Sequence, residues 1–570
     1  MSIIFPLGYD LFSKIREEGL YYVDKTEFIS ELLKQKFEVS LITRPRRFGK
    51  TLTMSMLADF FDIGIDSKAH FEGLKISNDA ELCDKWMNQW PVIFLSLKSV
   101  EGNDFGTAYE RLELLLSELF RKYDFIAKSG RVNQADQVDF IAIRDMRSSM
   151  PKTANSLSLL TRMLHAYYGR EVILLIDEYD VPLAKADAEG YYKEMLDVIR
   201  SMLGAVLKTN LHLKFAVLTG CLKISKESIF TGLNNIVVNT ITSERYDDSI
   251  GFTESDVGRL LADAGFEDHA SEVKAWYDGY RFGSEDIYCP WDVLNHVAAL
   301  QVNASAAPGN YWAATSHNDI IYKLFENRQF DVNSKFETLM AGEYIIEVIT
   351  EELTYDLIDA SEENLWSLLF MTGYLTLAKD ADIEEMPSQT RIRDSCVVRE
   401  KRAALRIPNE EVKLIFKRAI IDWFRKNVQT VDRKELFQAL WQGDTEKASE
   451  DISDLMFNTI SYHDYAESYY HAFVAGLFAG AGYIVESNYE YGDGRPDVVI
   501  KDKRGRRVLL FEVKHTDKGE TLEHACQEAL KQIRDRRYAE ALEGYRIVIA
   551  YGIAFKGKDC RIEQFVELQV

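Results

Sequence analysis

The sequence predicts an α/β protein made of several domains. In the first 240 residues, short apolar runs of strand-forming residues alternate with longer amphipathic stretches, which is typical of a parallel sheet flanked by helices. The chain of 570 residues is too long for one hydrophobic core, since cores stop growing at roughly 250–300 residues. Near the C-terminus, two apolar strands separated by a charged turn predict a second α/β region. We therefore expect a doubly wound parallel sheet, a mainly helical middle region and a C-terminal α/β domain.

Four apolar runs are the predicted strands of the N-terminal sheet: 39–42, 92–95, 172–176 and 215–218. The run 172–176 is apolar at every position, as expected for a strand covered by helices on both faces. After this sheet, aromatic-rich segments predict a mainly helical region of lid-like or winged-helix-like character. The predicted domains are 1–250 for the sheet domain, 251–408 for the helical middle, 409–450 for a helical connector and 451–570 for the C-terminal domain.

The composition narrows the class of protein. A formal net charge of −23 would repel a phosphate backbone at long range, so any nucleic-acid site has to be locally basic. The six cysteines lie far apart without a C-x-x-C pair, which argues against a zinc site or a disulfide framework and favours a reducing compartment. Charged residues occur early, and no run reaches the ~18 apolar residues of a membrane span. We expect a cytoplasmic protein with no membrane partner.

The segment 44–51 follows the first predicted strand and precedes residues at helical spacing. A phosphate-binding loop needs a glycine that lets backbone N–H groups surround phosphate, a lysine that reaches the outer oxygens and a hydroxyl that ligates Mg²⁺. Gly49, Lys50 and Thr51 supply these groups in this order. Arg44 stands where such loops usually carry their first glycine, so a basic turn before a helix is the alternative. The other loop residues expected to bind a nucleotide are Arg46, Arg47 and Phe48.

A second element supports the nucleotide site. The apolar strand 172–176 ends in two adjacent carboxylates, Asp177 and Glu178. In a P-loop enzyme the first acid holds Mg²⁺ together with the loop hydroxyl of Thr51, and the second polarises the attacking water. Thr219 follows another predicted strand, where it either senses the terminal phosphate or is structural.

A cluster of charged residues in the C-terminal domain predicts metal-dependent chemistry. Asp497 begins one strand of the predicted hairpin, and alternation places Glu512 and Lys514 on one face of the other strand. Two carboxylates can hold Mg²⁺ or Mn²⁺, while a nearby ammonium can orient or deprotonate a water and stabilise a pentavalent phosphate. This combination predicts phosphodiester hydrolysis. Glu467, at the start of a helical stretch, is a further candidate metal ligand.

The turn between these strands is basic. Residues 501–518 contain seven Lys or Arg and three acids, a local net charge of +4 in a negative chain. A phosphate backbone could bind here. The alternative is a solvated hairpin with a cross-strand ion pair, although burying both charges on an apolar strand is costly without a partner or metal. Three downstream residues either cover the site from a helix or are plain helix surface: Gln527, Gln532 and Tyr538.

These motifs together resemble a bacterial and archaeal group of AAA-ATPase-like proteins with a C-terminal PD-(D/E)XK nuclease superfamily domain. The resemblance also covers Tyr-Val-Asp-Lys-Thr at 22–26, Leu-Ile-Asp-Glu-Tyr-Asp at 175–180, Leu-Thr-Gly-Cys-Leu-Lys-Ile-Ser at 218–225, Trp-Tyr-Asp-Gly-Tyr-Arg-Phe at 276–282, Pro-Trp-Asp-Val-Leu-Asn at 290–295 and Thr-Gly-Tyr-Leu at 372–375. In this group an arginine in place of the first loop glycine looks like the normal form. The resemblance implies ATP with Mg²⁺ as ligands, Asp497 and Glu512 as metal ligands and Lys514 as the catalytic lysine, with Glu467 less securely assigned.

The leading hypothesis is an ATP-binding and ATP-hydrolysing protein coupled to a metal-dependent nuclease, with DNA as the expected partner. The first alternative is a nucleotide-driven switch or scaffold whose nuclease-like domain binds nucleic acid or a protein without cutting. The second is a signalling ATPase that assembles into a homo-oligomer. The choice of DNA or RNA, the mode of cutting and the biological pathway stay open at this point.

Overall fold

The computed structural model describes residues 3–223, 233–312, 321, 333–351, 353, 361–379, 402–428, 434–459, 467–480, 483–487, 495–502, 505–516, 520–538, 542, 544–557 and 559–567. The chain forms two compact units, Met1–Ser316 with Ile346–Glu411 and His317–Ile345 with Val412–Val570. The first unit therefore contains the predicted sheet domain together with most of the predicted helical middle. The boundaries expected at residues 250, 408 and 450 stay predictions.

The first unit is built on a five-stranded parallel sheet of order β2-β3-β4-β1-β5. Its strands are β1 (Val39–Thr43), β2 (Val92–Ser96), β3 (Val172–Asp177), β4 (Leu213–Gly220) and β5 (Ile236–Asn239). The four predicted strands are all present, and the short β5 was not predicted. Because all five strands run in the same direction, their carboxyl ends meet along one edge, where open α/β sheets bind ligands.

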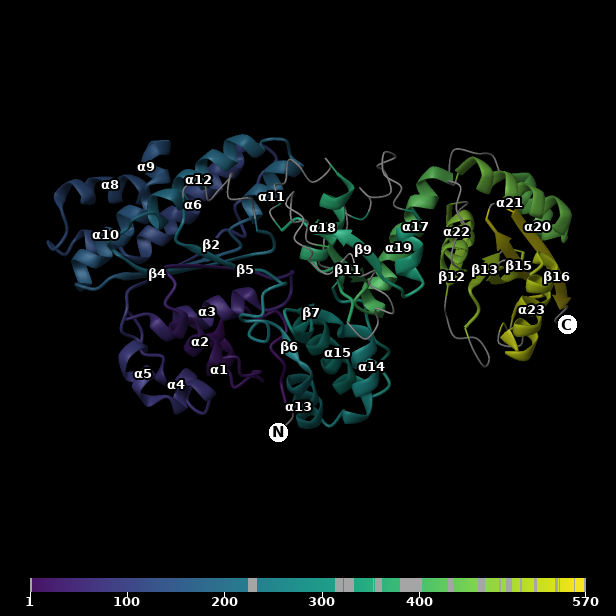
Figure 1. Cartoon of the computed structure of the whole chain (residues 1–570), viewed down its shortest axis with the longest axis horizontal. Coiled ribbons are helices and arrows are strands. Elements are labelled where there is room, and N and C mark those ends of the chain that lie inside the picture. The colour runs from purple at the N-terminus through teal and green to yellow at the C-terminus, as the bar shows by residue number, and fades with distance from the viewer. Residues whose placement is uncertain are drawn as a thin grey trace, which may run out of the picture. The chain divides into compact units, whose positions relative to one another are not determined.

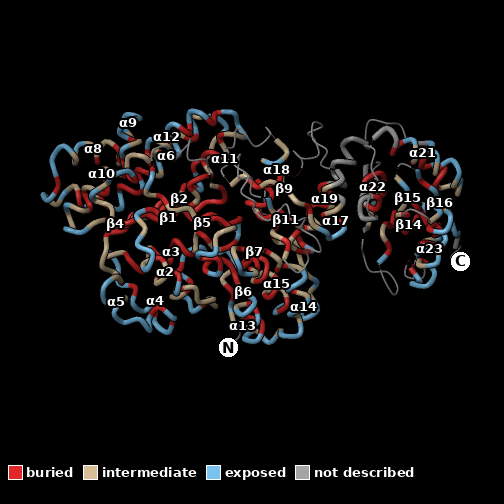
Figure 2. The backbone as a smooth tube through the Cα atoms, viewed as in Figure 1, coloured by how far each residue is buried: buried red, intermediate tan, exposed pale blue. Residues whose placement is uncertain are grey.

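Helices cover both faces of this sheet (Figure 1). One face carries α6 (Phe105–Lys122), α8 (Gln134–Arg144), α10 (Ser156–Tyr168) and α12 (Tyr192–Leu207), whose apolar sides form one core with alternate strand residues. The opposite face carries α3 (Lys50–Phe61), with α1 (Phe12–Glu17), α2 (Glu27–Gln35), α4 (Lys68–Phe71) and α5 (Ala80–Trp86) beyond it. Every residue of β1 and β3 is buried, and Figure 2 shows the strands as the buried centre of this layer. The doubly wound sheet is confirmed.

Shorter helices complete the N-terminal part of the first unit: α7 (Asp124–Ala127), α9 (Met150–Ala154) and α11 (Val181–Ala188), with the 3-10 turn Lys75–Asn78. The middle region is mainly helical, as predicted, with α13 (Glu254–Ala264), α14 (Ala270–Tyr277), α15 (Pro290–Val302) and α18 (Glu362–Thr372). It also contains two small sheets that were not predicted. One has the order β6-β8-β7 and the other β10-β11-β9. Their strands are β6 (Phe252–Thr253), β7 (Tyr280–Phe282), β8 (Glu285–Tyr288), β9 (Ile345–Val348), β10 (Thr376–Leu377) and β11 (Arg402–Arg406).

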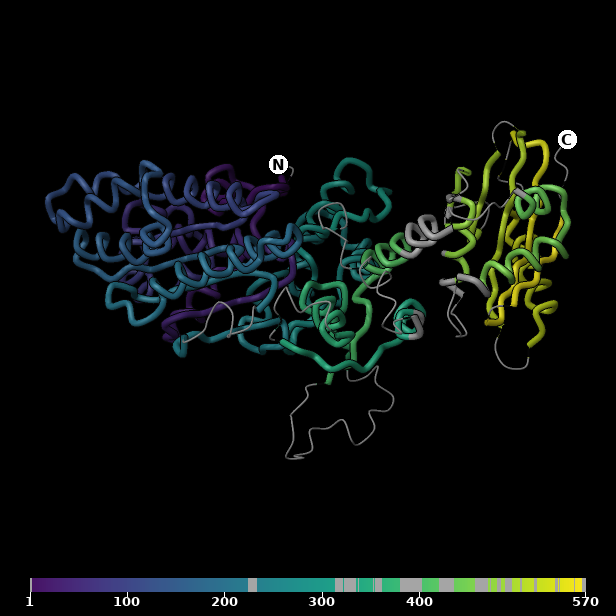
Figure 3. Tube along the Cα trace, turned by 90° about the horizontal axis from the view of Figure 1, so that it is seen from above, coloured from purple at the N-terminus to yellow at the C-terminus, as the bar shows by residue number. Residues whose placement is uncertain are grey.

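The second unit is built on a mixed sheet of order β12-β13-β14-β15-β16, in which only β14 and β15 are parallel. Its last strands are the long yellow segments near the C-terminus in Figure 3. Its strands are β12 (Ile484–Ser487), β13 (Val498–Asp502), β14 (Arg507–His515), β15 (Ile547–Lys556) and β16 (Asp559–Glu567). Its helices are α17 (Asn333–Met340), α19 (Glu410–Val428), α20 (Lys434–Gln442), α21 (Thr445–Thr459), α22 (Glu467–Gly480) and α23 (Leu522–Asp535). The predicted C-terminal hairpin is present as β13 and β14. None of the helices in the described part of the chain is long and apolar enough to cross a membrane.

A substitution of Gly279 tests how tightly the middle region is packed. It lies between α14 and β7 with φ of 94°, and a Cβ placed there would meet the carbonyl oxygen of Pro408 at 2.0 Å. We expect Gly279→Ala to lower the free energy of unfolding by about 3 kcal/mol or more, because both the backbone conformation and the close approach exclude a side chain. Urea unfolding measures the change.

Gly258 is the matched control for this substitution. It is exposed in α13, and a Cβ there meets nothing within 4 Å. Gly258→Ala should stabilise the protein by about 0.5–1 kcal/mol. Equal effects of the two substitutions would contradict the packing described for Gly279.

Candidate functional site

The predicted phosphate loop connects β1 to α3 at the carboxyl edge of the parallel sheet. Gly49 has φ of 95° and is the N-cap residue of α3. It has no side chain that could cap the N–H groups in the first turn of this helix. A glycine adopts this conformation without strain, and a helix N-terminus of this kind attracts anions. The Lys50 ammonium donates to the carbonyl oxygens of Arg44 at 3.1 Å and Pro45 at 3.0 Å, so the lysine lies across the inside of the loop.

Lys50 is buried and is surrounded by groups that favour its charged form. Its Nζ lies 3.6 Å from Cys221 Sγ and 3.8 Å from Glu178 Oε1. Burial alone would lower the pKa of Lys50, but the carboxylates of Glu178, Asp180 and Asp177 act in the opposite direction, and the net shift of its pKa is upward. Burial raises the pKa of the Cys221 thiol to about 12, so this side chain is neutral at physiological pH. The loop therefore carries a permanent cation facing a carboxylate.

Asp177 joins the loop to two other strands. Its carboxylate accepts hydrogen bonds from Thr51 Oγ1 at 2.8 Å and Thr219 Oγ1 at 2.6 Å, with Ser96 Oγ at 3.2 Å. The carboxylate is fully buried, and burial raises its pKa. These oxygen donors are the kind that Mg²⁺ prefers, so Thr51 and Asp177 fit the predicted cation site. Thr219 lies where the sequence predicted it, bonded to the proposed metal ligand.

Glu178 follows Asp177 with an uncommon backbone conformation. Its φ is 54°, in the left-handed region that costs energy for a residue with a side chain. This turn directs the carboxylate toward the loop, where Oε1 lies 3.8 Å from Lys50 Nζ. Strained residues of this kind cluster at functional sites. The position agrees with the predicted role of Glu178 in orienting a water.

Arg44 is a structural residue of the loop. Its guanidinium is fully buried and donates to four main-chain carbonyls, those of Thr43, Asn239, Thr240 and Tyr246, at 2.7–3.3 Å. Burial lowers its pKa to about 10, so it remains charged near neutral pH. A glycine could not make these bonds. The arginine therefore anchors the start of the loop to the segment after β5, which explains the departure from the usual pattern.

The middle region packs directly on the phosphate loop. The Phe48 ring lies 4.9 Å from Tyr280 and 5.1 Å from Phe282, centroid to centroid, so its side chain points into the middle region. The exposed Arg47 places its guanidinium 4.5 Å from the Trp291 ring. The exposed Arg46 accepts a hydrogen bond on its carbonyl oxygen from Trp312 Nε1 at 3.3 Å. The aromatic motifs of the middle region, for which the sequence analysis predicted no role, thus shape the loop.

Two buried carboxyl groups lie behind this contact. Glu411, at the start of α19, accepts a hydrogen bond from the main-chain N–H of Trp312 at 2.8 Å. Asp292, in the first turn of α15, is fully buried. Burial raises the pKa of both groups, and the proximity of Asp292 raises that of Glu411 further. Two acids in one apolar site cannot both ionise cheaply, so one shared proton held by Glu411 is the favoured state.

A partly open apolar pocket adjoins the loop, and the sequence analysis did not anticipate it. It is lined by Tyr22, Val23, Leu52, Thr53, Phe252 and Leu294, among others. Leu52 and Thr53 follow directly after the loop in α3, so the pocket lies beside the loop. The only sequence signal was the motif 22–26, which matched a family pattern without a chemical role.

The second predicted site lies in the other unit, on β13 and β14. Val498 pairs with Phe511, so the register sets Asp497 opposite Glu512. Asp497 Oδ2 accepts a hydrogen bond from the N–H of Val513 at 2.9 Å. Lys514 Nζ lies 4.0 Å from Glu512 Oε1, with 22% of the lysine side chain exposed and 3% of the glutamate. The three charged residues therefore converge as the alternation predicted, and two carboxylates beside an ammonium suit Mg²⁺ or Mn²⁺.

Helices α22 and α23 support this site. Gln532 Nε2 donates to Glu512 Oε1, and Tyr538 is buried with its pKa raised by burial and by Glu512. Gln527 lies elsewhere, since its amide bonds to Glu563 on β16. His471 was not predicted from the sequence. Its Nε2 contacts the carbonyl oxygen of Asp497 at 2.5 Å, and burial lowers its pKa to about 3, so it is neutral and donates this bond.

The expectation for Glu467 is only partly within the described structure. Glu467 is the first residue of α22, one helical turn before His471, but its side chain lies outside the described residues. The basic turn is less available than its composition suggested. Lys501 pairs with Glu486 at 2.7 Å and Arg507 with Asp502 at 2.8 Å. Arg506 donates to the carbonyl oxygen of Gly544, and the basic positions 503, 504 and 518 lie outside the described part of the chain.

Comparisons with known proteins match one family model to a part of each unit. Residues 6–230 match the family model of predicted AAA-ATPases, and residues 465–565 match that of the PD-(D/E)XK nuclease superfamily. The chain is also 29% identical over 547 residues to an uncharacterized protein in the vnfD 5' region of Azotobacter chroococcum mcd 1, covering 94% of this chain and 93% of that protein. The resemblance to these two families is confirmed.

The buried acid pair predicts how stability depends on pH. In the unfolded chain Glu411 ionises near its ordinary pKa of 4.5, while the folded protein keeps it protonated to higher pH. The folded state thus binds more protons, so this contribution to stability is complete below about pH 4.5 and is lost as the pH rises through the raised pKa. Glu411→Gln keeps a neutral hydrogen-bonding side chain, so we expect a flatter pH dependence by up to about 1.4 kcal/mol per pH unit.

Urea unfolding from about pH 5.5 to about pH 8.5 measures this slope. The exposed neighbour Glu410 provides the control, and Glu410→Gln should leave the slope of the wild-type protein unchanged. A slope for Glu411→Gln as steep as that of the wild-type protein would exclude a protonated Glu411.

Proposed function

We propose that this chain, in which an AAA-ATPase-like domain and a PD-(D/E)XK nuclease superfamily domain are joined, is an ATP-regulated nuclease. ATP binding and hydrolysis in the first unit would control the cleavage of nucleic acid, DNA in the first instance, by the second. The observation that carries the proposal is the convergence of Asp497, Glu512 and Lys514 at one end of β13 and β14. The assignments of individual residues below are part of this proposal.

In the ATP site each charged group has one task. Lys50 and the N–H groups of the loop bind the outer phosphates, and the hydroxyl of Thr51 with the carboxylate of Asp177 would hold Mg²⁺. A bound Mg²⁺ neutralises the charge that develops on the phosphates. Glu178 orients and polarises the attacking water from its position beside Lys50. Thr219 keeps Asp177 oriented through its hydrogen bond.

In the nuclease site Asp497 and Glu512 would hold Mg²⁺ or Mn²⁺, with Glu467 as a further candidate ligand. The metal, when bound, polarises the phosphate and lowers the pKa of a water. Lys514 orients that water and stabilises the negative charge on the phosphate, which its partly exposed ammonium can reach. Gln532 holds one oxygen of Glu512, so the carboxylate keeps a fixed direction.

One observation favours the alternative of a switch or scaffold that binds without cutting. Glu512 Oε1 already accepts a hydrogen bond from Gln532 and lies within ion-pair distance of Lys514, so protein groups compensate part of its charge. Under this alternative the surface around Asp497, Glu512 and Lys514 binds nucleic acid or a protein without cutting it. ATP turnover would then serve only to change the conformation of the protein. A signalling ATPase that forms a homo-oligomer would share the nucleotide site, and mass measurements with and without ATP address it.

Cleavage assays with single substitutions test the proposal. Lys514→Ala should reduce the cleavage of DNA by about 10²–10⁴-fold in Mg²⁺ or Mn²⁺ while ATP turnover is unchanged, because the lysine acts only at the phosphodiester. Lys531→Ala, which removes an exposed lysine of α23 in the same unit, should cleave as the wild-type protein does. Cleavage by Lys514→Ala at the wild-type rate would exclude the nuclease assignment, and assays on RNA and on single strands define the substrate.

The nucleotide half has its own test. Glu178→Gln should bind ATP with wild-type affinity but hydrolyse it about 10²–10⁴-fold more slowly, because the amide cannot take up a proton from water. Lys50→Ala should lose ATP binding itself. Calorimetry gives the affinities, and phosphate release gives the rates. Wild-type hydrolysis by Glu178→Gln would remove Glu178 from the mechanism.

A further inference from the structure

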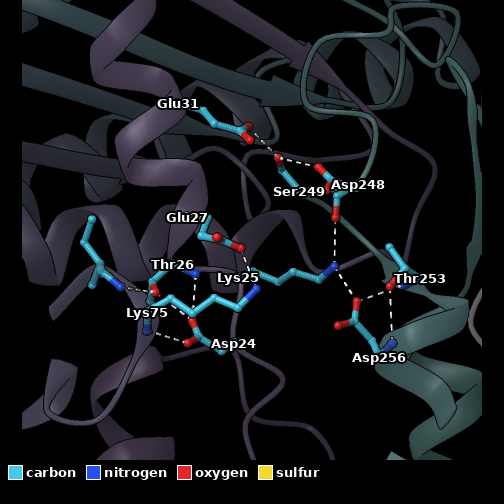
Figure 4. Close-up of polar contacts among 11 residues, drawn as sticks. Asp24, Lys25, Thr26, Glu27, Glu31, Lys75, Asp248, Ser249, Thr253 and Asp256 are labelled. Atoms are coloured by element: carbon cyan, nitrogen blue, oxygen red, sulfur yellow. Dashed lines mark hydrogen bonds and ion pairs between the residues drawn. The ribbon is translucent and has the colours of Figure 1, made fainter. Parts of the chain in front are cut away.

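The motif 22–26 has no role in the chemistry described so far, yet it contains a lysine that is mostly buried. The Lys25 ammonium donates to Asp256 Oδ2 at 2.6 Å and to the carbonyl oxygen of Asp248 at 2.8 Å (Figure 4). Only 16% of the Lys25 side chain and 17% of the Asp256 side chain are exposed. Moving the charge of Lys25 out of water costs free energy unless well-placed partners compensate it, so the question is what this ion pair holds in place.

Both ends of this ion pair are rigidly held. Asp24 accepts hydrogen bonds from Thr26 and from the main-chain N–H of Lys75, which fixes the turn that presents Lys25. Asp256 also accepts a hydrogen bond from the N–H of Thr253, as part of the capping box that begins α13. Burial raises the pKa of Asp256, but Lys25 and these hydrogen bonds lower it by more. Lys25 therefore ties the N-terminal segment to the first turn of α13.

The segments joined in this way are the ones that line the apolar pocket beside the phosphate loop. Tyr21, Tyr22, Val23 and Lys25 come from one segment, and Ser249, Gly251 and Phe252 come from the other. Two further bonds cross between the same parts of the chain. Tyr21 donates to Asp263 at 2.8 Å, and Ser249 donates to Glu31 at 3.1 Å. Among these three cross-links, the one between Lys25 and Asp256 is an ion pair, and Lys25 itself lines the pocket.

We propose that Lys25 is a positioning residue for the nucleotide, which holds the segment 249–252 against the pocket and so sets the affinity for the nucleoside part of ATP. The proposal rests on the proposed ATP binding. Phosphates held by Gly49–Thr51 leave the ribose and the flat base to extend past Leu52, where apolar and aromatic side chains offer a surface for it. A pocket whose two segments are already joined binds its ligand without the cost of ordering them.

The test separates the nucleoside from the phosphates. Calorimetry with ATP and with inorganic tripolyphosphate is carried out on the full chain with Mg²⁺. Lys25→Met, which keeps most of the length of the side chain without its charge, should weaken ATP binding roughly tenfold. Its affinity for tripolyphosphate should stay within about twofold of the wild-type value, because the phosphate loop is untouched. Lys25→Arg should recover most of the ATP affinity, since a guanidinium can still bridge Asp248 and Asp256.

Two controls keep the result decisive. Lys501→Met removes a lysine of similar burial that pairs with Glu486 in the other unit, and it should bind ATP as the wild-type protein does. Asp256→Asn removes the same ion pair from the opposite side and should also weaken ATP but not tripolyphosphate. If Lys25→Met binds ATP normally, or loses ATP and tripolyphosphate equally, the positioning role is wrong. If the wild-type protein binds no ATP, the proposed function itself fails.

Discussion

Burial of charge at the ends of apolar strands governs both candidate sites. Asp177 ends β3 and Glu512 lies near the end of β14, and both carboxylates are almost completely removed from solvent. A carboxylate in that position is unfavourable unless donors or cations surround it. In the first unit hydroxyls from neighbouring strands and helix α3 satisfy Asp177, and in the second an amide and an ammonium lie at the Oε1 atom of Glu512. The same requirement makes both places suitable for a divalent cation.

The phosphate loop depends on residues far from it in the sequence. Arg44 binds carbonyls after β5, Phe48 inserts between aromatic rings of β7, and the carbonyl of Arg46 receives the Trp312 indole. Most P-loops rely on glycines for their shape. Here a buried arginine and an aromatic cluster fix the shape instead, so the middle region is part of the candidate nucleotide site. Trp312 also contacts Glu411, the first buried residue of α19.

Much of the fold could be predicted because it follows from local patterns. Continuous apolar runs gave the strands β1 to β4, and alternation placed Glu512 beside Lys514. The short β5 and the small sheets of the middle region escaped prediction. Such strands have two to five residues, which are too few to show a clear period, and apart from the hairpin of β7 and β8 their pairing partners lie far away in the chain. The sequence left Gln527 open between covering the site and plain helix surface, because helical spacing does not say which strand a given face contacts.

The sequence by itself determined the chemistry: a glycine, lysine and threonine after one strand, two acids after another, and the carboxylates and lysine of the C-terminal hairpin. These are fixed by residue type and by spacings of a few residues. Only the tertiary structure decided what surrounds them, namely the anchoring of Arg44, the apolar pocket beside Leu52, the bond from His471 to Asp497 and the pair of Lys25 with Asp256. Lys25 and Asp256 are 231 positions apart, and a contact of that separation arises from how helices and strands pack, which no local pattern encodes.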